Sequence, residues 1–173
     1  MHRHTTALLL ILYGIAVLPG CGGVRALQRI IQPPRFEQAP NHPAEIRLVA
    51  PSLANPAGGA GVTLWLQVTN PNPFGFTISH LDTTLLLEGT RAADGDFPLG
   101  LPLGAGQSSV IPVDLSISFA ELPALGAVIQ RAARGSAVGY ELEGTVGIDA
   151  GPFGRPIFGP LRFVAGELRV GRP

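Results

Sequence analysis

The side chains that acid–base chemistry would use are few outside the N-terminal segment. The most suggestive group is His80, with Ser79 before it and Asp82 two residues after it, the residue types of a serine hydrolase. In a hydrolase triad the serine hydroxyl must reach the imidazole. Adjacent side chains of a regular strand point to opposite faces, so we expect Ser79 to miss the ring and His80 with Asp82 to form a solvated polar pair. The sequence therefore predicts no catalytic residues and no enzyme.

Metal ions and cofactors are not predicted either. After the N-terminal segment histidine occurs only at positions 42 and 80, and the chain has one cysteine, which is a poor basis for a zinc site. Asp94-Gly95-Asp96 resembles part of a calcium loop but lacks the remaining ligands, so we interpret it as a turn. The GGAG stretch at 58–61 precedes a strand instead of a helix, and we expect a flexible loop there, not a phosphate-binding loop.

The remaining candidate for covalent chemistry is Cys21. It follows an apolar run of 12 residues, from Ala7 to Leu18. This run is too short to span a membrane, which takes about 20 residues, but it suits the apolar region of a signal peptide. A lone cysteine is otherwise read as a buried free thiol. Its place at the end of an apolar run favours modification instead.

The stretch Leu18-Pro19-Gly20-Cys21 resembles the lipobox of bacterial lipoproteins, with leucine at −3 and glycine at −1. Proline at −2 and a weakly basic N-terminus depart from that pattern. The resemblance implies that residues 1–20 are a signal peptide and that Cys21 is acylated after cleavage. Several acyl chains give a stable anchor where one is marginal. Gly22, in place of an acidic residue, resembles the class sorted to the periplasmic face of the outer membrane.

Residues 21–44 are expected to form the lipidated N-terminus and a Pro-rich tether. The segment PPRFEQAPNHP, from 33 to 43, has four prolines in 11 residues and no apolar period. Pro-rich segments behave as semi-rigid spacers. A disordered leader is the alternative. The folded domain is then predicted to span 45–170.

The composition indicates one folded domain. Of the 173 residues 46% are hydrophobic and only 14% are charged, which excludes a disordered chain, and the length is close to that of an average domain. Twelve basic residues balance twelve acidic ones without a basic cluster, which argues against a nucleic-acid partner. The 23 glycines and 17 prolines, with little helical periodicity, favour an all-β fold.

Alternating apolar and polar residues predict the strands. The clearest runs are GVTLWLQV, SVIPVDLSISF and VGYELEGTVGID, each with one buried and one solvated face, which is typical of antiparallel sheets. The period changes phase within Phe76–Leu87 and again across Ala165-Gly166, which indicates bulges or bends. One segment, residues 120–135, has helical spacing, with Pro123 in its first turn and Gly135 as its C-terminal cap. We predict a short helix across one end of a sandwich.

A proline-rich corner, TNPNPFGF at 69–76, ends the first of these strands. Proline lacks a backbone N–H and fixes φ, and the residue before it avoids the helical region. Asparagine closes a turn with its own side chain. We predict that Asn70, Pro71, Asn72 and Pro73 form a rigid structural corner and that Phe74 is the first buried residue of the next strand.

A strand ending in V-x-N-P-N-P-F is similar to the type 2 late embryogenesis abundant proteins, also called the water stress and hypersensitive response domain. The similarity extends from EIRLVAPSL at residue 45, through LLLEGTRAADGDF and the helix, to GELRV at residue 170. It implies an all-β fold, an antiparallel seven-stranded Greek-key β-sandwich of immunoglobulin or fibronectin III type with one short helix. Asn70 and Asn72 are then corner residues and not ligands.

Two functions follow. The family resemblance implies a non-enzymatic envelope lipoprotein linked to desiccation and stress protection, acting through contacts with membrane or envelope proteins. The alternative is a module that binds lipid or another apolar ligand between the sheets or at the sandwich end near the helix. The expected partners are the membrane, reached through acyl chains on Cys21, and envelope proteins or lipid. We expect no cofactor and a monomeric domain.

Overall fold

The computed structural model describes residues 31–53, 56–119 and 125–168. The described chain contains eight strands, one α-helix and one 3-10 turn. In chain order they are β1 (Arg35–Gln38), β2 (Glu45–Val49), β3 (Gly59–Thr69), β4 (Phe76–Leu87), β5 (Thr90–Leu103), β6 (Ser108–Ser118), α2 (Gly126–Ala133), β7 (Val138–Asp149), η2 (Gly151–Phe153) and β8 (Ile157–Leu168).

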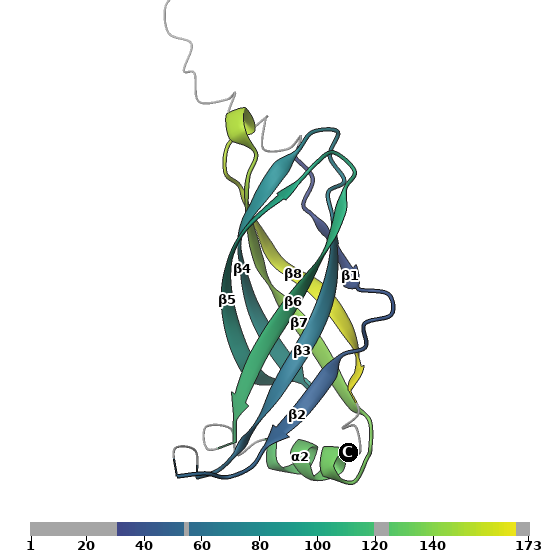
Figure 1. The fold of residues 1–173 in the computed structure, drawn as a ribbon, viewed down its shortest axis with the longest axis vertical. Coiled ribbons are helices and arrows are strands. Elements are labelled where there is room, and N and C mark those ends of the chain that lie inside the picture. The colour runs from purple at the N-terminus through teal and green to yellow at the C-terminus, as the bar shows by residue number, and fades with distance from the viewer. Residues whose placement is uncertain (1–30, 54–55, 120–124, 169–173) are drawn as a thin grey trace, which may run out of the picture. The chain divides into compact units, whose positions relative to one another are not determined.

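The strands form two antiparallel sheets of four strands each (Figure 1). In the first sheet β3 pairs with β6 on one side, while β1 and β2 share its other side at opposite ends. The second sheet has the order β5-β4-β7-β8. The connections β3–β4, β5–β6 and β6–β7 each pass from one sheet to the other, which is a Greek-key pattern. Because β1 and β2 occupy one position, the sandwich has seven strand positions, and the predicted fold is confirmed.

The core lies between the inward faces of the two sheets, as the alternation of the sequence predicts. Every second residue of β3 from Ala60 to Val68 is buried, and in its partner β6 every second residue from Ile111 to Ile117 is buried. The largest fully buried side chains from the strands are Leu64, Leu66, Ile78, Leu81, Leu85, Leu142, Ile148 and Leu168. Leu125, just before α2, is also fully buried. Each such side chain stabilises the fold by about 1.5–3 kcal/mol.

The predicted phase change in β4 is confirmed as a bulge. The pairing of β4 shifts register between Ile78 and His80 against both neighbouring strands. In β8 the irregularities lie opposite residues 142–146 of β7, earlier than the predicted Ala165-Gly166. Gly144 lies beside the second of these places, and a Cβ atom there would lie 1.9 Å from the backbone oxygen of Asp82 in β4. The GGAG stretch also differs from its prediction: residues 59–61 are already part of β3, paired with β2 and β6.

Residues 31–44 differ from the expected tether. They contain β1, and Ile31 is only 4% exposed, so the folded unit begins at Ile31. The Phe36 ring lies 4.5 Å from that of Phe163 of β8, and the hydroxyl of Tyr140, whose pKa is raised by burial, donates to Gln38 Oε1 at 2.9 Å. β1 was not predicted because four residues between prolines are too few to show an alternating pattern. Its Phe36 nevertheless packs between the two sheets.

The helix covers one end of the sandwich. Figure 1 shows α2 beyond the ends of β2, β3 and β7, whereas the small coil of η2 lies at the opposite end. Gly135 ends the helix as predicted, with φ of 80° and its N–H donating to the carbonyl of Ala132 at 2.9 Å. Residues 120–124, with Pro123, lie outside the described chain.

Three of the four sheet edges carry prolines within their strands. β5 contains Pro98 and Pro102, β6 contains Pro112, and β8 contains Pro160. Each is an edge strand of its sheet. Proline has no N–H to offer to a further strand, so it limits edge-to-edge pairing.

Candidate functional site

The first asparagine of the corner is bound on every side. Asn70 is fully buried. Its Nδ2 donates to three backbone carbonyls, those of Phe74 (2.8 Å), Leu103 (3.2 Å) and Gly104 (3.0 Å). Its Oδ1 accepts from the backbone N–H of Asn72 at 2.9 Å, closing an Asx turn. Asn70 thus ties the β3–β4 crossover to the start of the β5–β6 crossover, and no polar atom of its side chain remains for a ligand.

The second asparagine holds the N-terminal segment. Asn72 is 2% exposed. Its Oδ1 accepts from the N–H of Gln32 at 2.8 Å, and its Nδ2 donates to the Gln32 carbonyl at 2.9 Å and to Asn70 Oδ1 at 3.1 Å. The side-chain amide therefore takes the place that a neighbouring strand would have beside Gln32.

The position predicted for Phe74 requires a correction. β4 begins at Phe76, which is buried, whereas Phe74 is only partly buried and lies before the strand. Its ring stacks on that of Phe153 in η2, with centroids 4.6 Å apart. Glycine at position 75 separates the two phenylalanines and delays the strand by two residues. Pro71 is half-buried and Pro73 is exposed.

The sequence-based argument about Ser79 and His80 is also wrong. The Ser79 hydroxyl lies 3.1 Å from His80 Nδ1, because the bulge after Ile78 interrupts the strict alternation of faces. His80 Nε2 lies 3.9 Å from Asp82 Oδ2, and both side chains are substantially exposed. This distance is too long for the hydrogen bond that orients a catalytic histidine. His42 is exposed on the other sheet, with its ring 5.0 Å from that of Trp65.

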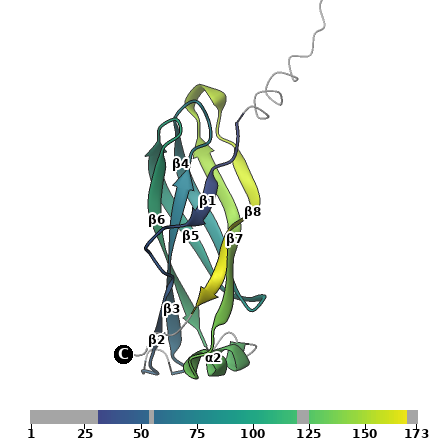
Figure 2. The same ribbon diagram turned by 90° about the vertical axis from the view of Figure 1, so that its right-hand side faces the viewer.

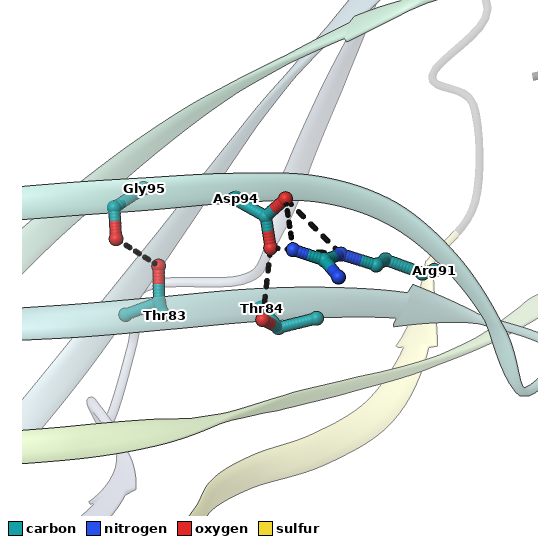
Figure 3. Close-up of polar contacts among 5 residues, drawn as sticks. All are labelled: Thr83, Thr84, Arg91, Asp94 and Gly95. Carbon is teal, nitrogen blue, oxygen red and sulfur yellow. Dashed lines mark hydrogen bonds and ion pairs between the residues drawn. The ribbon is translucent and has the colours of Figure 1, made fainter. Parts of the chain in front are cut away.

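The predicted turn Asp94-Gly95-Asp96 lies inside β5, and the hairpin turn is Glu88-Gly89. Asp94 joins an exposed polar network: it accepts from Thr84 at 2.9 Å and from Arg91 at 2.6 Å (Figure 3). The hydrogen bond from Arg91 holds the pKa of the Asp94 carboxyl below its usual value. Among the residues that the structure describes, no group of three or more metal-binding side chains exists.

An apolar pocket lies at the helix-covered end of the sandwich. It is lined by Ile46, Leu48, Ala60, Leu87, Ile117, Phe119, Leu125, Val128, Ala132, Val138 and Leu168. All eleven are apolar, and they come from both sheets and from the helix. The pocket is small, with a cavity volume of about 30 Å³. It is therefore a narrow, dry slot.

The slot is bordered by β2 on one side and by the end of β8 on the other. Figure 2 looks onto this side of the domain, with β2 and β3 at one side, β7 and β8 at the other and α2 below. Farther along the same side, Phe36 and Phe163 close the gap. Leu48 lines the slot and is still 49% exposed. Its position identifies the β2 side as the opening.

The sequence pointed to the sandwich end near the helix as a possible apolar site, but it did not predict the wall made by β2. Ile46 and Leu48 carry an alternating signal over five residues only, which says nothing of where the strand packs. The proposed lipidation site, Cys21, lies outside the described residues. In the part of the chain that the structure describes, no helix is long and apolar enough to cross a membrane.

The fold and its corner define an antiparallel β-sandwich domain with a single short helix in the described chain. Residues 66–158 match the family described as late embryogenesis abundant protein, 93 of the 173 residues, and the chain belongs to this family. The family is associated with stress and desiccation and is generally non-enzymatic.

One solved structure supports the fold. A protein from Arabidopsis thaliana, known from a solution structure, is 17% identical with a TM-score of 0.55, covering 73% of this chain and 78% of that chain. At this identity the likeness concerns the fold alone. A protein from Archaeoglobus fulgidus, known from a crystal structure, is 14% identical with a TM-score of 0.44, over 76% of this chain and 98% of that one. No curated protein matches.

Proposed function

We propose that this protein is a non-enzymatic lipoprotein, anchored at the periplasmic face of the outer membrane, whose domain binds an acyl chain in the apolar slot beside α2. The observation that carries the proposal is the slot itself. A buried space lined by eleven apolar residues offers no partner to a polar ligand and favours an apolar one.

The shape of the slot favours an unbranched chain over a ring. The slot holds only about 30 Å³ of free volume, less than any ligand needs, so an acyl chain enters only as the lining side chains move apart. An unbranched chain requires the smallest such displacement. Each methylene buried there contributes about 0.8 kcal/mol. A broader ligand would have to displace α2, whose Val128 and Ala132 form part of the wall.

Native mass spectrometry of the mature protein tests this function. We expect a non-covalent lipid adduct that disappears on denaturation, in contrast to covalent acylation, which persists. Ala132→Phe fills the slot and is expected to lose the adduct. Ala127→Phe, on the exposed side of the same helix, is the matched control and should keep it. Adducts of equal abundance in both variants, or none in the parent protein, would contradict binding in the slot.

A second candidate function is stress protection by contact with membranes or other envelope proteins. The observation that favours it is the family match. It requires no ligand, so Ala132→Phe should then protect as well as the parent. Survival of cells after drying, compared between the parent and the Ala132→Phe variant at equal protein level, separates the two functions.

The anchor is tested separately. Cys21→Ser removes the sulfur to which the acyl chain would be attached, so it should leave the signal peptide uncleaved and abolish labelling by a fatty-acid probe. Labelling that persists in this variant would exclude Cys21 as the lipidated residue.

A further inference from the structure

Large apolar side chains that are exposed to solvent gather at the two ends of the described domain. Leu48, Val49 and Leu53 lie at the end that holds the slot. The remaining three such residues are Val110, Phe153 and Ile157. Val110 pairs with Gln67, close to the corner, and Phe153 and Ile157 belong to η2 and the start of β8. The second group therefore lies at the opposite end from the helix (Figure 1).

The chain enters the domain at this second end. Gln32 is held by both polar atoms of Asn72, and Asn72 is joined to Asn70. Asn70 in turn binds the carbonyl of Phe74, whose ring stacks on Phe153. An unbroken series of contacts thus connects the first described residues with the exposed aromatic ring of η2.

The sequence between the anchor and the domain is short. Only residues 22–30 separate Cys21 from Ile31, and this distance is at most about 35 Å at full extension. The 11 residues of β3 span about 37 Å. For the slot end to reach the anchoring membrane, the connecting segment would have to run back along almost the whole sandwich. The corner end needs no such extension.

We propose that the corner end is a membrane-docking surface, on which Phe153 and Ile157, supported by Phe74, rest at the headgroup level of the anchoring bilayer. The proposal rests on the proposed lipid anchor. Aromatic side chains are favoured at membrane interfaces. Arg155, beside them and 81% exposed along its side chain, donates through Nε to Asp149 Oδ2 at 2.8 Å, and its terminal nitrogens can contact lipid phosphates. Anchoring makes the docking step intramolecular, so a small surface suffices. The slot then faces away from the anchoring membrane.

A fluorescent probe at each end tests the orientation. Acylated Cys21 leaves the mature chain without a free thiol, so Ile157→Cys and Leu53→Cys each provide a single labelling position. A small bimane probe is attached, and the acylated protein is placed in nanodiscs of phosphatidylethanolamine and phosphatidylglycerol with brominated acyl chains. A docked side chain lies about 5–10 Å into the boundary of headgroups and acyl chains. Bromine should therefore quench the probe at 157, and not the probe at 53.

The same samples contain the outcomes that overturn the proposal. Equal quenching at both positions, or quenching at 53 alone, excludes docking by the corner end. Adding Phe153→Asp to the Ile157→Cys protein should abolish quenching although the protein stays in the nanodisc, since Phe153 is on the surface and its loss leaves the core intact. The mass of each sample reports acylation: an acylated but unquenched protein refutes docking alone, whereas an unacylated one refutes the anchor and docking together.

Discussion

Asn72 presents its whole side-chain amide to the backbone of Gln32, accepting from the N–H at 2.8 Å and donating to the carbonyl at 2.9 Å. The two residues are 40 positions apart. This pairing fixes the point at which the chain enters the sandwich. It also gives the second asparagine of the corner a role different from that of the first, which joins the two crossovers.

Asn72→Asp should destabilise the domain by at least about 2 kcal/mol. A carboxylate cannot donate a hydrogen bond to the Gln32 carbonyl, and its negative charge would be buried away from solvent. Thermal melts at neutral pH measure the effect. Asn41→Asp is the control: Asn41 is exposed with φ of 62°, a conformation that both residues adopt, and its change should stay within about 0.5 kcal/mol. Similar melting temperatures for all three proteins would show that the Asn72 amide is not needed.

A chain that begins at Ile31 should fold as stably as the mature protein, whereas one that begins at Glu45 should be destabilised by more than about 3 kcal/mol. The shorter chain lacks Ile31 and Phe36 and leaves Phe163 uncovered. Denaturant unfolding followed by circular dichroism measures both chains. Equal midpoints would mean that residues 31–44 form a tether after all.

Gly144→Ala should cost about 1–3 kcal/mol or prevent folding, since the new methyl group overlaps the backbone of Asp82, which cannot yield as a side chain would. Gly61→Ala is the matched control in another strand, because nothing lies within 4 Å of a Cβ atom there. Its stability should equal or exceed that of the parent. Urea unfolding of the two variants gives the comparison, and a harmless Gly144→Ala would disprove the close approach of β4 and β7.

Stability should depend on pH through Asp94. Its pKa is lowered in the folded state by the hydrogen bond from Arg91, so the stabilisation is present above the unfolded pKa of about 3.9 and is lost as the pH falls through the lower, folded value. Asp94→Asn should therefore melt slightly below the parent at pH 6, with a difference that vanishes in strong acid. The effect is small because the pair is exposed. Asp96→Asn serves as the control on the same strand. A constant difference at all pH values would exclude the pair as its origin.

The sequence predicted the buried faces correctly where a strand is long and alternates apolar and polar residues along its whole length. β3 and β6 alternate over 11 residues each, so their inward faces follow from the pattern alone. The strand β1 escaped prediction because four residues between prolines are too few for a period. Its placement comes from the fit of Phe36 against Phe163, which no local pattern encodes.

The candidate sites also divide into contacts that are local in sequence, which could be predicted, and contacts between distant segments, which could not. The turn chemistry of Asn70 is local and readable, since its own backbone lies within two residues. The contacts of Asn72 with Gln32 and the apolar slot depend on segments far apart in sequence. The contact between Ser79 and His80 depends on a bulge. The phase change in the sequence predicted that bulge, but it did not predict how the bulge would orient the neighbouring side chains.

Under the proposed stress function, the prolines of the sheet edges have a consequence when the protein becomes concentrated as water is lost. Pairing between strand edges grows with protein concentration, and it is the first step from single domains to fibres. Pro98, Pro112 and Pro160 each remove a backbone donor at which a second chain would attach. Three of the four sheet edges thus resist pairing with a second chain when the protein is densely packed.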